Sequence, residues 1–289
     1  STADLNKAAK RIVESKSFDN SALCTNESVL ITLEETDARL RQSFKQARAH
    51  VCAEDDVARL RRYLFHDRGF NIECIGRDAV WIAQECGIRV PDGTLILLAP
   101  VGQIGIEEPL SREKLCPVLA YHTVKSRRQA ITQARAVLRL AGAGHSAAIH
   151  ASDEQVAMRF ASAVEAYRVV VNAPCTQGAA GFQTALAPTF TIGTGFFGRS
   201  SVGENIGPQH LIQWTRLAYN SDAAEPFGNY HGLSSGFSGP LPEAPADGVP
   251  GSSDYRTPSP RTSEDTVSGV TRDELRRMIA EELRAVLGK

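Results

Sequence analysis

The 289-residue sequence has almost no net charge. Its 32 Lys and Arg residues nearly balance its 33 Asp and Glu residues, which leaves a formal net charge of −1 at pH 7. Proteins that bind the phosphate backbone of nucleic acids or an anionic membrane surface usually carry an excess of positive charge. The composition therefore gives no case for nucleic acid or a membrane surface as a partner.

The sequence also lacks a long apolar run. A transmembrane helix needs about 20 consecutive, mostly apolar residues, and the sequence contains no such stretch. Its first residues have neither the basic start nor the apolar centre of a secretory signal peptide. From the sequence we expect a cytoplasmic protein.

Metal-binding and disulfide patterns are missing as well. No two of the six cysteines are spaced as Cys-x-x-Cys, which argues against a disulfide framework and a structural zinc site. None of the seven histidines has another histidine four residues away, as a helical metal site would require. We expect free thiols in a reducing compartment and no bound metal. The cysteines are Cys24, Cys52, Cys74, Cys86, Cys116 and Cys175.

Helical and strand patterns alternate along the first 220 residues. Apolar residues at helical spacing predict helices at 4–16, 37–49, 55–65, 79–86, 126–141 and 153–163. Apolar or β-branched runs bounded by turn residues predict strands at 29–33, 95–98, 119–124, 146–150, 168–172 and 210–219. This alternation favours an α/β fold with a doubly wound, largely parallel sheet.

The C-terminal part has a different composition. Gly, Pro, Ser and Asp dominate residues 221–269, and no segment there has an apolar face to bury, so we predict a flexible linker. Residues 270–289 predict an amphipathic helix, because Thr271 and Glu274 form a capping box and apolar residues then recur on one face. An isolated helix of this length is marginal in water, so its apolar face needs a partner.

Cys24 lies on a predicted loop between a helix and a strand. The Asp19-Asn20 pair before it favours a turn, and the apolar run that begins at Val29 favours a strand. Such a loop can present a thiolate in a cleft, where it attacks carbonyl carbons well. A free cysteine is more often a small buried apolar residue, and we assign that packing role to the other five cysteines.

Phe18-Asp19-Asn20 followed by Cys24-x-x-Glu27 is the first of four stretches that carry a family resemblance. In the same order along the chain, these stretches resemble the CoA-acylating aldehyde dehydrogenases, including those of bacterial microcompartments, and the first resembles the family's active-site segment. The similarity covers roughly residues 1–220 and implies the fold of the catalytic and oligomerisation region, in which a strand at 210–219 contributes to a homo-oligomer. The other three stretches are 113–120, 171–178 and 186–193, the last continuing through 200–212.

The resemblance implies the oxidation of a short aldehyde to an acyl-CoA, with NAD as cofactor and coenzyme A as co-substrate. Cys24 would be the nucleophile that forms a thioester, and its own backbone N–H would form part of the oxyanion hole. Glu113 matches the glutamate that binds the nicotinamide ribose. His210 matches the histidine of a Gly-Pro-x-His-Leu segment and could accept a proton from the thiol. A solvated loop glutamate and a structural histidine are the plain alternatives for these two residues.

The same stretches contain further candidate binding residues. Gly193, Thr194 and Gly195 would allow close approach of the cofactor or the pantetheine arm to the backbone. The resemblance implies that Asn172 and Thr176 are polar residues of the aldehyde pocket.

Two alternatives in function remain open. Arg199 could bind a CoA phosphate or an anionic aldehyde such as sulfoacetaldehyde, although a surface arginine is commoner. The family's nucleotide-binding region and the asparagine that completes its oxyanion hole have no counterpart in this sequence. The chain could therefore be a non-catalytic, truncated dehydrogenase domain with a shell-binding or assembly role. The presence of Cys24, Glu113 and His210 speaks against that alternative.

The linker and the terminal helix resemble the encapsulation peptides of microcompartment enzymes. Those peptides are also short amphipathic helices on flexible tethers. The resemblance implies that residues 271–287 bind a shell protein and that the enzyme works inside a bacterial microcompartment. A coiled-coil helix, or a helix that folds back on its own domain, remains an alternative.

Overall fold

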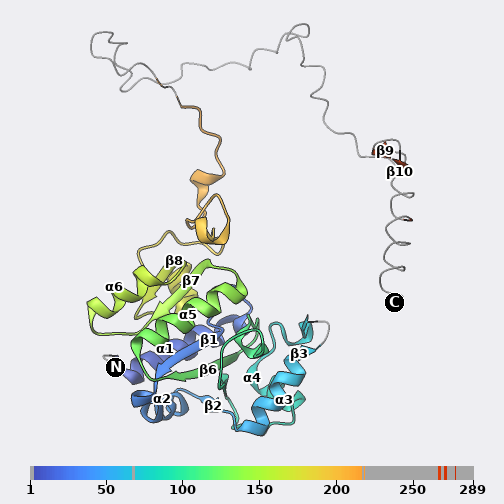
Figure 1. Ribbon diagram of the computed structural model, residues 1–289, viewed down its shortest axis with the longest axis vertical. Helices are drawn as coiled ribbons and strands as arrows, with labels where there is room; N and C mark the ends of the chain where they lie inside the picture. The colour runs from blue at the N-terminus through green and yellow to red at the C-terminus, as the bar shows by residue number, and fades with distance from the viewer. Residues whose placement is uncertain are drawn as a thin grey trace. The chain divides into compact units, whose positions relative to one another are not determined.

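The computed structural model describes residues 3–66, 69–216 and 218, and in the C-terminal part residues 266–267, 270–271 and 277. The chain divides into two units, Ser1–Arg216 and Leu217–Lys289 (Figure 1). In the second unit, β9 (Thr266–Val267) and β10 (Val270–Thr271) form an antiparallel pair. The predicted linker and the predicted terminal helix otherwise lie outside the described residues and stay predictions.

A four-stranded parallel sheet forms the centre of the first unit. In spatial order its strands are β1 (Val29–Leu33), β6 (Val118–Val124), β5 (Ile96–Pro100) and β2 (Ala49–Val51). Val29 of β1 lies opposite Ala120 of β6, and Leu97 of β5 lies opposite Val118. The prediction of an α/β fold with a largely parallel sheet is confirmed.

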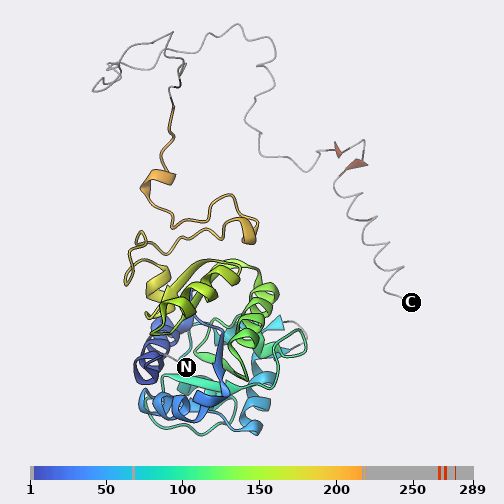
Figure 2. The ribbon, with the colours of Figure 1, turned by 60° about the vertical axis from the view of Figure 1, so that its left-hand side comes forward.

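Helices cover both faces of this sheet (Figure 2). The covering helices are α1 (Leu5–Ser17), α2 (Glu34–Gln46), α3 (Glu54–Leu64) and α4 (Ala79–Glu85). On one face, Ile96 and Leu98 of β5 share an apolar cluster with residues of α1 and α2. On the other face, Leu97 and Ala99 share a cluster with residues of α3 and α4. A strand buried on both faces has a continuous apolar sequence, which is why this strand could be predicted.

A second, two-stranded parallel sheet lies beside the first (Figure 1). Its elements and the helices around it are α5 (Arg127–Ala141), β7 (Gly144–Ile149), α6 (Glu154–Ala163), β8 (Ala166–Val171) and α7 (Cys175–Ala179). The starts of α5 and α6 are capped by side chains. Ser126 Oγ accepts from Gln129 N at 3.2 Å, and Asp153 Oδ1 accepts from Gln155 N at 2.9 Å.

Several short elements differ from the sequence-based expectation. The predicted helix at 37–49 is too long at its end, because Arg48 has a left-handed φ of 68° and Ala49 begins β2. The guanidinium of Arg48 donates to Gly93 O at 2.8 Å and so stabilises this reversal. The hairpin of β3 (Phe65–His66) and β4 (Gly69–Phe70) and the one-turn α7 are also not predicted. Strands of two residues and a helix of about one turn are too short for periodicity to reveal.

The strand predicted at 210–219 is wrong as far as Arg216. Residues Pro208–His210 form a 3₁₀ turn, and residues 211–216 have no regular structure. A strand needs a neighbour that satisfies its backbone groups, and no such neighbour lies beside it in the described part of the chain. Leu211 and Trp214 are instead 83% and 64% exposed.

We find no helix long and apolar enough to cross a membrane in the part of the chain that the structure describes.

Candidate active site

Cys24 lies on a sharply folded loop between α1 and β1. The loop begins with a 3₁₀ turn, Phe18–Ser21, in which Asp19 and Asn20 have φ values of 50° and 47°. Asp and Asn tolerate this left-handed backbone better than most residues. Cys24 is exposed, whereas the other five cysteines are buried, as predicted for them. One thiol is therefore open to reagents and substrates.

The loop opens on a cavity of about 850 Å³. The cavity is lined by β1, α5 and β7, and among its lining residues are Cys24, Glu113, Thr194 and Arg199. The structure thus brings together four of the predicted site residues from three distant stretches of the sequence. Burial raises the pKa of the Cys24 thiol, and the nearby Glu113 carboxylate raises it further, while Arg168 opposes them. At neutral pH the thiol is protonated and needs a base.

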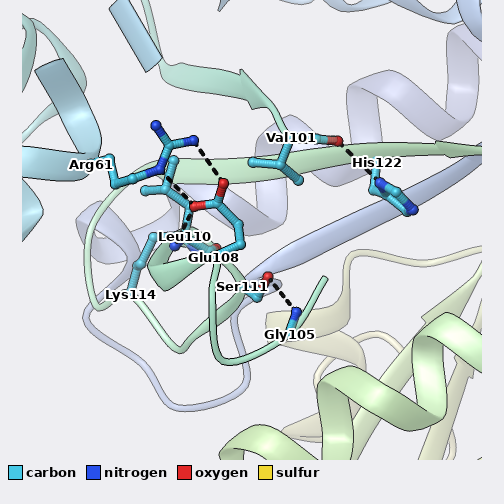
Figure 3. Close-up of polar contacts among 8 residues, drawn as sticks. All are labelled: Arg61, Val101, Gly105, Glu108, Leu110, Ser111, Lys114 and His122. Atoms are coloured by element: carbon cyan, nitrogen blue, oxygen red, sulfur yellow. Dashed lines mark hydrogen bonds and ion pairs between the residues drawn. The ribbon is translucent and has the colours of Figure 1, made fainter. Parts of the chain in front are cut away.

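Glu113 lies on the loop between β5 and β6. Polar contacts hold this loop in place (Figure 3). Arg61 donates to both carboxylate oxygens of Glu108, at 3.0 and 2.7 Å, and Glu108 also accepts from Leu110 N at 3.1 Å. Lys114 is completely buried. Its Nζ donates to Leu110 O at 2.6 Å, to Arg112 O at 2.8 Å and to Ser28 O at 2.9 Å.

The loop that contains Gly193, Thr194 and Gly195 is fixed by Arg168 of β8. This guanidinium is 3% exposed and donates to Gly193 O at 2.8 Å and to Asn205 Oδ1 at 2.6 Å. A Cβ on Gly193 would lie 2.0 Å from Val202 O, so close packing within the loop requires glycine there. Of the three predicted residues, Thr194 lines the cavity, whereas the two glycines shape the loop around it.

Asn172 and Thr176 are not among the cavity-lining residues. Asn172 has a left-handed φ of 54° and links the ends of β7 and β8, because its side chain bonds both the N–H and the C=O of Ala151. Thr176 is completely buried, and its Oγ1 donates to Ser15 O at 3.1 Å. Their predicted substrate-binding role stays a prediction, beside these structural contacts.

His210 does not line the cavity either. Its Nε2 lies 3.2 Å from Glu204 Oε2, and its Nδ1 accepts from Gly207 N at 3.0 Å. Its predicted catalytic role is untested by these contacts. In this structure it belongs to a local turn.

His145 is a cavity-lining residue that the sequence analysis missed. It lies at the start of β7, and its carbonyl accepts from Arg168 Nη1 at 3.2 Å. Burial and the Arg168 charge lower the pKa of the imidazole, so its ring is neutral at pH 7 and can take a proton. His145 is the second residue of β7, and a search for polar residues at strand starts would have found it.

No cluster of three or more His, Cys, Asp or Glu side chains is arranged to hold a metal ion among the residues that the structure describes.

From the lowered pKa of the buried Lys114 we predict that the free energy of unfolding rises with pH above neutrality. Burial, reinforced by repulsion from Lys16, lowers the pKa of Lys114 from 10.5 to about 7. Between these values the unfolded chain binds more protons than the folded one, so the free energy of unfolding increases with pH, by at most about 1.4 kcal/mol per unit for one group. Urea unfolding measured from about pH 7 to 8.5 gives this slope. This pH range ends below 9.0, the ordinary pKa of a thiol, so that titration of the buried cysteines adds little to the slope.

The variant Lys114→Met should have a shallower slope, and Lys10→Met, at an exposed position, should match the wild type. Equal slopes in all three proteins would contradict the assignment to Lys114.

Curated relatives of the chain are acylating and bifunctional aldehyde dehydrogenases. The aldehyde-alcohol dehydrogenase of Streptococcus pneumoniae is 38% identical over 221 residues, which are 73% of this chain and 25% of the relative. The succinate-semialdehyde dehydrogenase (acetylating) of Clostridium kluyveri is 35% identical over 226 residues, 77% of this chain and 50% of the relative. The chain thus spans half or less of these relatives. No protein-family profile matches it.

Solved structures agree with these relatives. The acetylating aldehyde dehydrogenase from Geobacillus thermoglucosidasius has a TM-score of 0.74 and 31% identity, over 77% of this chain and 49% of that one. The propionaldehyde dehydrogenase of the Clostridium phytofermentans fucose utilisation microcompartment has a TM-score of 0.64 and 28% identity, over 71% and 45% of the two chains. The exposed Cys24 lies at the cavity, and the sequence resemblance places this cysteine in the family's active site. The chain belongs to the acylating aldehyde dehydrogenase family of oxidoreductases and corresponds to a part of the length of its members.

Proposed function

We propose that this chain supplies the acyl-transfer centre of a CoA-acylating aldehyde dehydrogenase that acts on a short aldehyde. The observation that carries the proposal is the one exposed thiol, Cys24, at a cavity also lined by Glu113 and His145. The comparisons support it, because a solved propionaldehyde dehydrogenase of Rhodopseudomonas palustris contains bound CoA and an acylated cysteine.

The residues of this chain can carry out the thiol chemistry. The neutral ring of His145 takes the proton of Cys24, and the thiolate adds to the aldehyde carbon to give a thiohemiacetal. The backbone N–H of Cys24 would supply part of the oxyanion hole that stabilises the developing charge. After oxidation to the thioester, the thiol of CoA attacks the acyl carbon, and Cys24 is released as the leaving group.

Glu113 is the residue of this chain that fits a nicotinamide cofactor. Its carboxylate lines the cavity beside Cys24 and can accept from the two vicinal hydroxyls of a ribose. NAD supplies the hydride acceptor for the oxidation when it is bound; one related solved enzyme, an engineered glycolyl-CoA reductase, contains NADP+ instead.

Acylation of Cys24 from an acyl-CoA tests the proposal without a nucleotide. The Cys24 sulfur should attack the thioester of propionyl-CoA, form a new thioester and release the CoA thiol, so that intact mass spectrometry detects one added propionyl group. Cys24→Ser should remain unmodified, and Cys175→Ser, at a buried thiol, should react like the wild type.

An unmodified wild-type protein would favour the alternative of a non-catalytic domain with an assembly role. Succinyl-CoA, as a second acyl donor, tests the alternative of an anionic substrate. Arg199 lines the cavity and could bind the carboxylate of the succinyl group. An anionic substrate predicts a preference for succinyl-CoA that Arg199→Ala removes.

His145 and His150 line the cavity, and the sequence resemblance implies His210 as the base; substitution distinguishes His145 from His210. His145→Gln should slow acylation by about 10²-fold or more, the usual contribution of a positioned base. His210→Gln should leave the rate near that of the wild type, because His210 lies outside the cavity lining. The opposite pattern would restore the role of His210 that the sequence resemblance implies.

We further propose, from the sequence alone, that residues 271–287 bind a microcompartment shell protein and that the dehydrogenase unit forms a homo-oligomer. A fluorescent protein fused to residues 221–289 should form foci in cells that assemble microcompartments. Replacing Leu275 and Leu283 by Asp should disperse these foci, because the apolar face would be lost. A diffuse signal from the unchanged fusion would refute the targeting role.

A further inference from the structure

A buried lysine joins the two loops that form the site. Lys16 lies in the last turn of α1 and is completely buried. Its Nζ donates to Asn26 Oδ1 on the Cys24 loop and, at 3.2 Å, to Lys114 O on the Glu113 loop. One ammonium group therefore bonds both loops at once.

On the Cys24 loop, Asn26 connects Lys16 to the backbone around the thiol. Asn26 Nδ2 donates to Leu23 O at 2.6 Å and to Ser21 O at 3.2 Å. Leu23 directly precedes Cys24, so the Asn26 side chain holds the backbone segment 21–26 that carries the thiol. The oxygen of the Asn26 amide bonds Lys16, and its nitrogen bonds this segment.

On the Glu113 loop, two lysines hold the peptide groups on both sides of the glutamate. Lys114 Nζ donates to Arg112 O at 2.8 Å, and Lys16 Nζ donates to Lys114 O. Lys114 also bonds the start of β1, through Ser28 O at 2.9 Å and, with its backbone N–H, Ser28 Oγ at 3.2 Å. The Cys24 and Glu113 loops are thus connected at several points by the same two side chains.

A nearby carboxylate opposes the cost of burying Lys16 without occupying its donors. Burial lowers the pKa of Lys16 to about 8, and Glu27 is among the groups that oppose this shift. The Glu27 carboxylate is hydrogen-bonded elsewhere, to Ser15 Oγ at 2.7 Å and Cys175 N at 3.3 Å. A buried ammonium is costly unless it is hydrogen-bonded, and here those bonds go to the two loops.

We propose that Lys16 and Asn26 are positioning residues, which set the thiol of Cys24 against the carboxylate of Glu113 without touching the substrate. This inference rests on the proposed acyl-transfer function. Neither residue follows from the periodicity of the sequence, because a lysine at the end of a helix ordinarily points to solvent.

The variant Asn26→Asp separates positioning from folding. It keeps the shape of the side chain and the oxygen that accepts from Lys16, but it replaces the nitrogen that holds Leu23 O and Ser21 O by a second oxygen. We expect acylation of Cys24 by propionyl-CoA to fall about 10²-fold, the usual loss when a reacting group is misplaced by about 1 Å. Alkylation by iodoacetamide, which needs only an accessible thiol, should stay within about threefold of the wild type.

Asn71→Asp is the matched control, because Asn71 makes the same kinds of contact and does not line the cavity. Its Nδ2 donates to Tyr63 O at 3.3 Å, and its Oδ1 accepts from Glu73 N at 3.1 Å. It should change neither rate. Equal losses of acylation and alkylation in Asn26→Asp, or no loss of acylation, would overturn the positioning role.

Hydrogen–deuterium exchange tests the connection between the loops independently of acylation. Lys16→Met removes both contacts, so exchange should become faster in residues 21–28 and 110–116 together. Asn26→Asp, which keeps the contact of Lys16 with Lys114, should accelerate exchange in residues 21–28 alone. Acceleration confined to one loop in Lys16→Met would overturn the proposal. A wild-type protein that is not acylated would refute the proposed function, and the exchange data would still decide whether Lys16 connects the loops.

Discussion

The parallel pairing of β1 with β6 is the constraint on which the site depends. Because the two strands run in the same direction and Val29 lies opposite Ala120, the segments that enter them meet at the amino edge of the sheet. Cys24 belongs to one of these segments and Glu113 to the other. Ligands of doubly wound sheets ordinarily bind beyond the carboxyl ends of the strands. Here the reactive thiol precedes its strand, and the entering loops must be held by their own contacts.

Buried cations provide those contacts. Lys16, Lys114 and Arg168 are each almost completely buried, and the hydrogen bonds described for their charged groups end on carbonyl or amide oxygens. Carbonyl oxygens satisfy the donors without neutralising the charge, so part of the cost of burying it remains. In return, one ammonium or guanidinium joins backbone segments that lie far apart in the sequence. Of these charges, that of Arg168 also opposes the rise in the pKa of the Cys24 thiol.

The sequence predicted the regular part of the fold better than the site. The strand at 29–33 was predicted to the residue, because a β-branched run follows a turn and both are local features. The thiol was also predictable, since its loop position and its neighbours are local. His145 was not, because a motif match selected another histidine, and only the folded chain shows that His145 and His150 line the cavity. Lys16 could not be predicted either, as its burial depends on Lys114, which is distant in sequence.

The distribution of thiols has a consequence for how the protein is damaged. Burial raises the pKa of Cys52, Cys74 and Cys86 to about 12, and Cys116 and Cys175 are shifted in the same direction. Oxidants such as peroxide react with accessible thiolates, so the buried sulfurs are poor targets and the apolar core is protected. Oxidative inactivation would then be confined to the surface sulfur of Cys24, and a thiol reductant could reverse its first step without unfolding the chain.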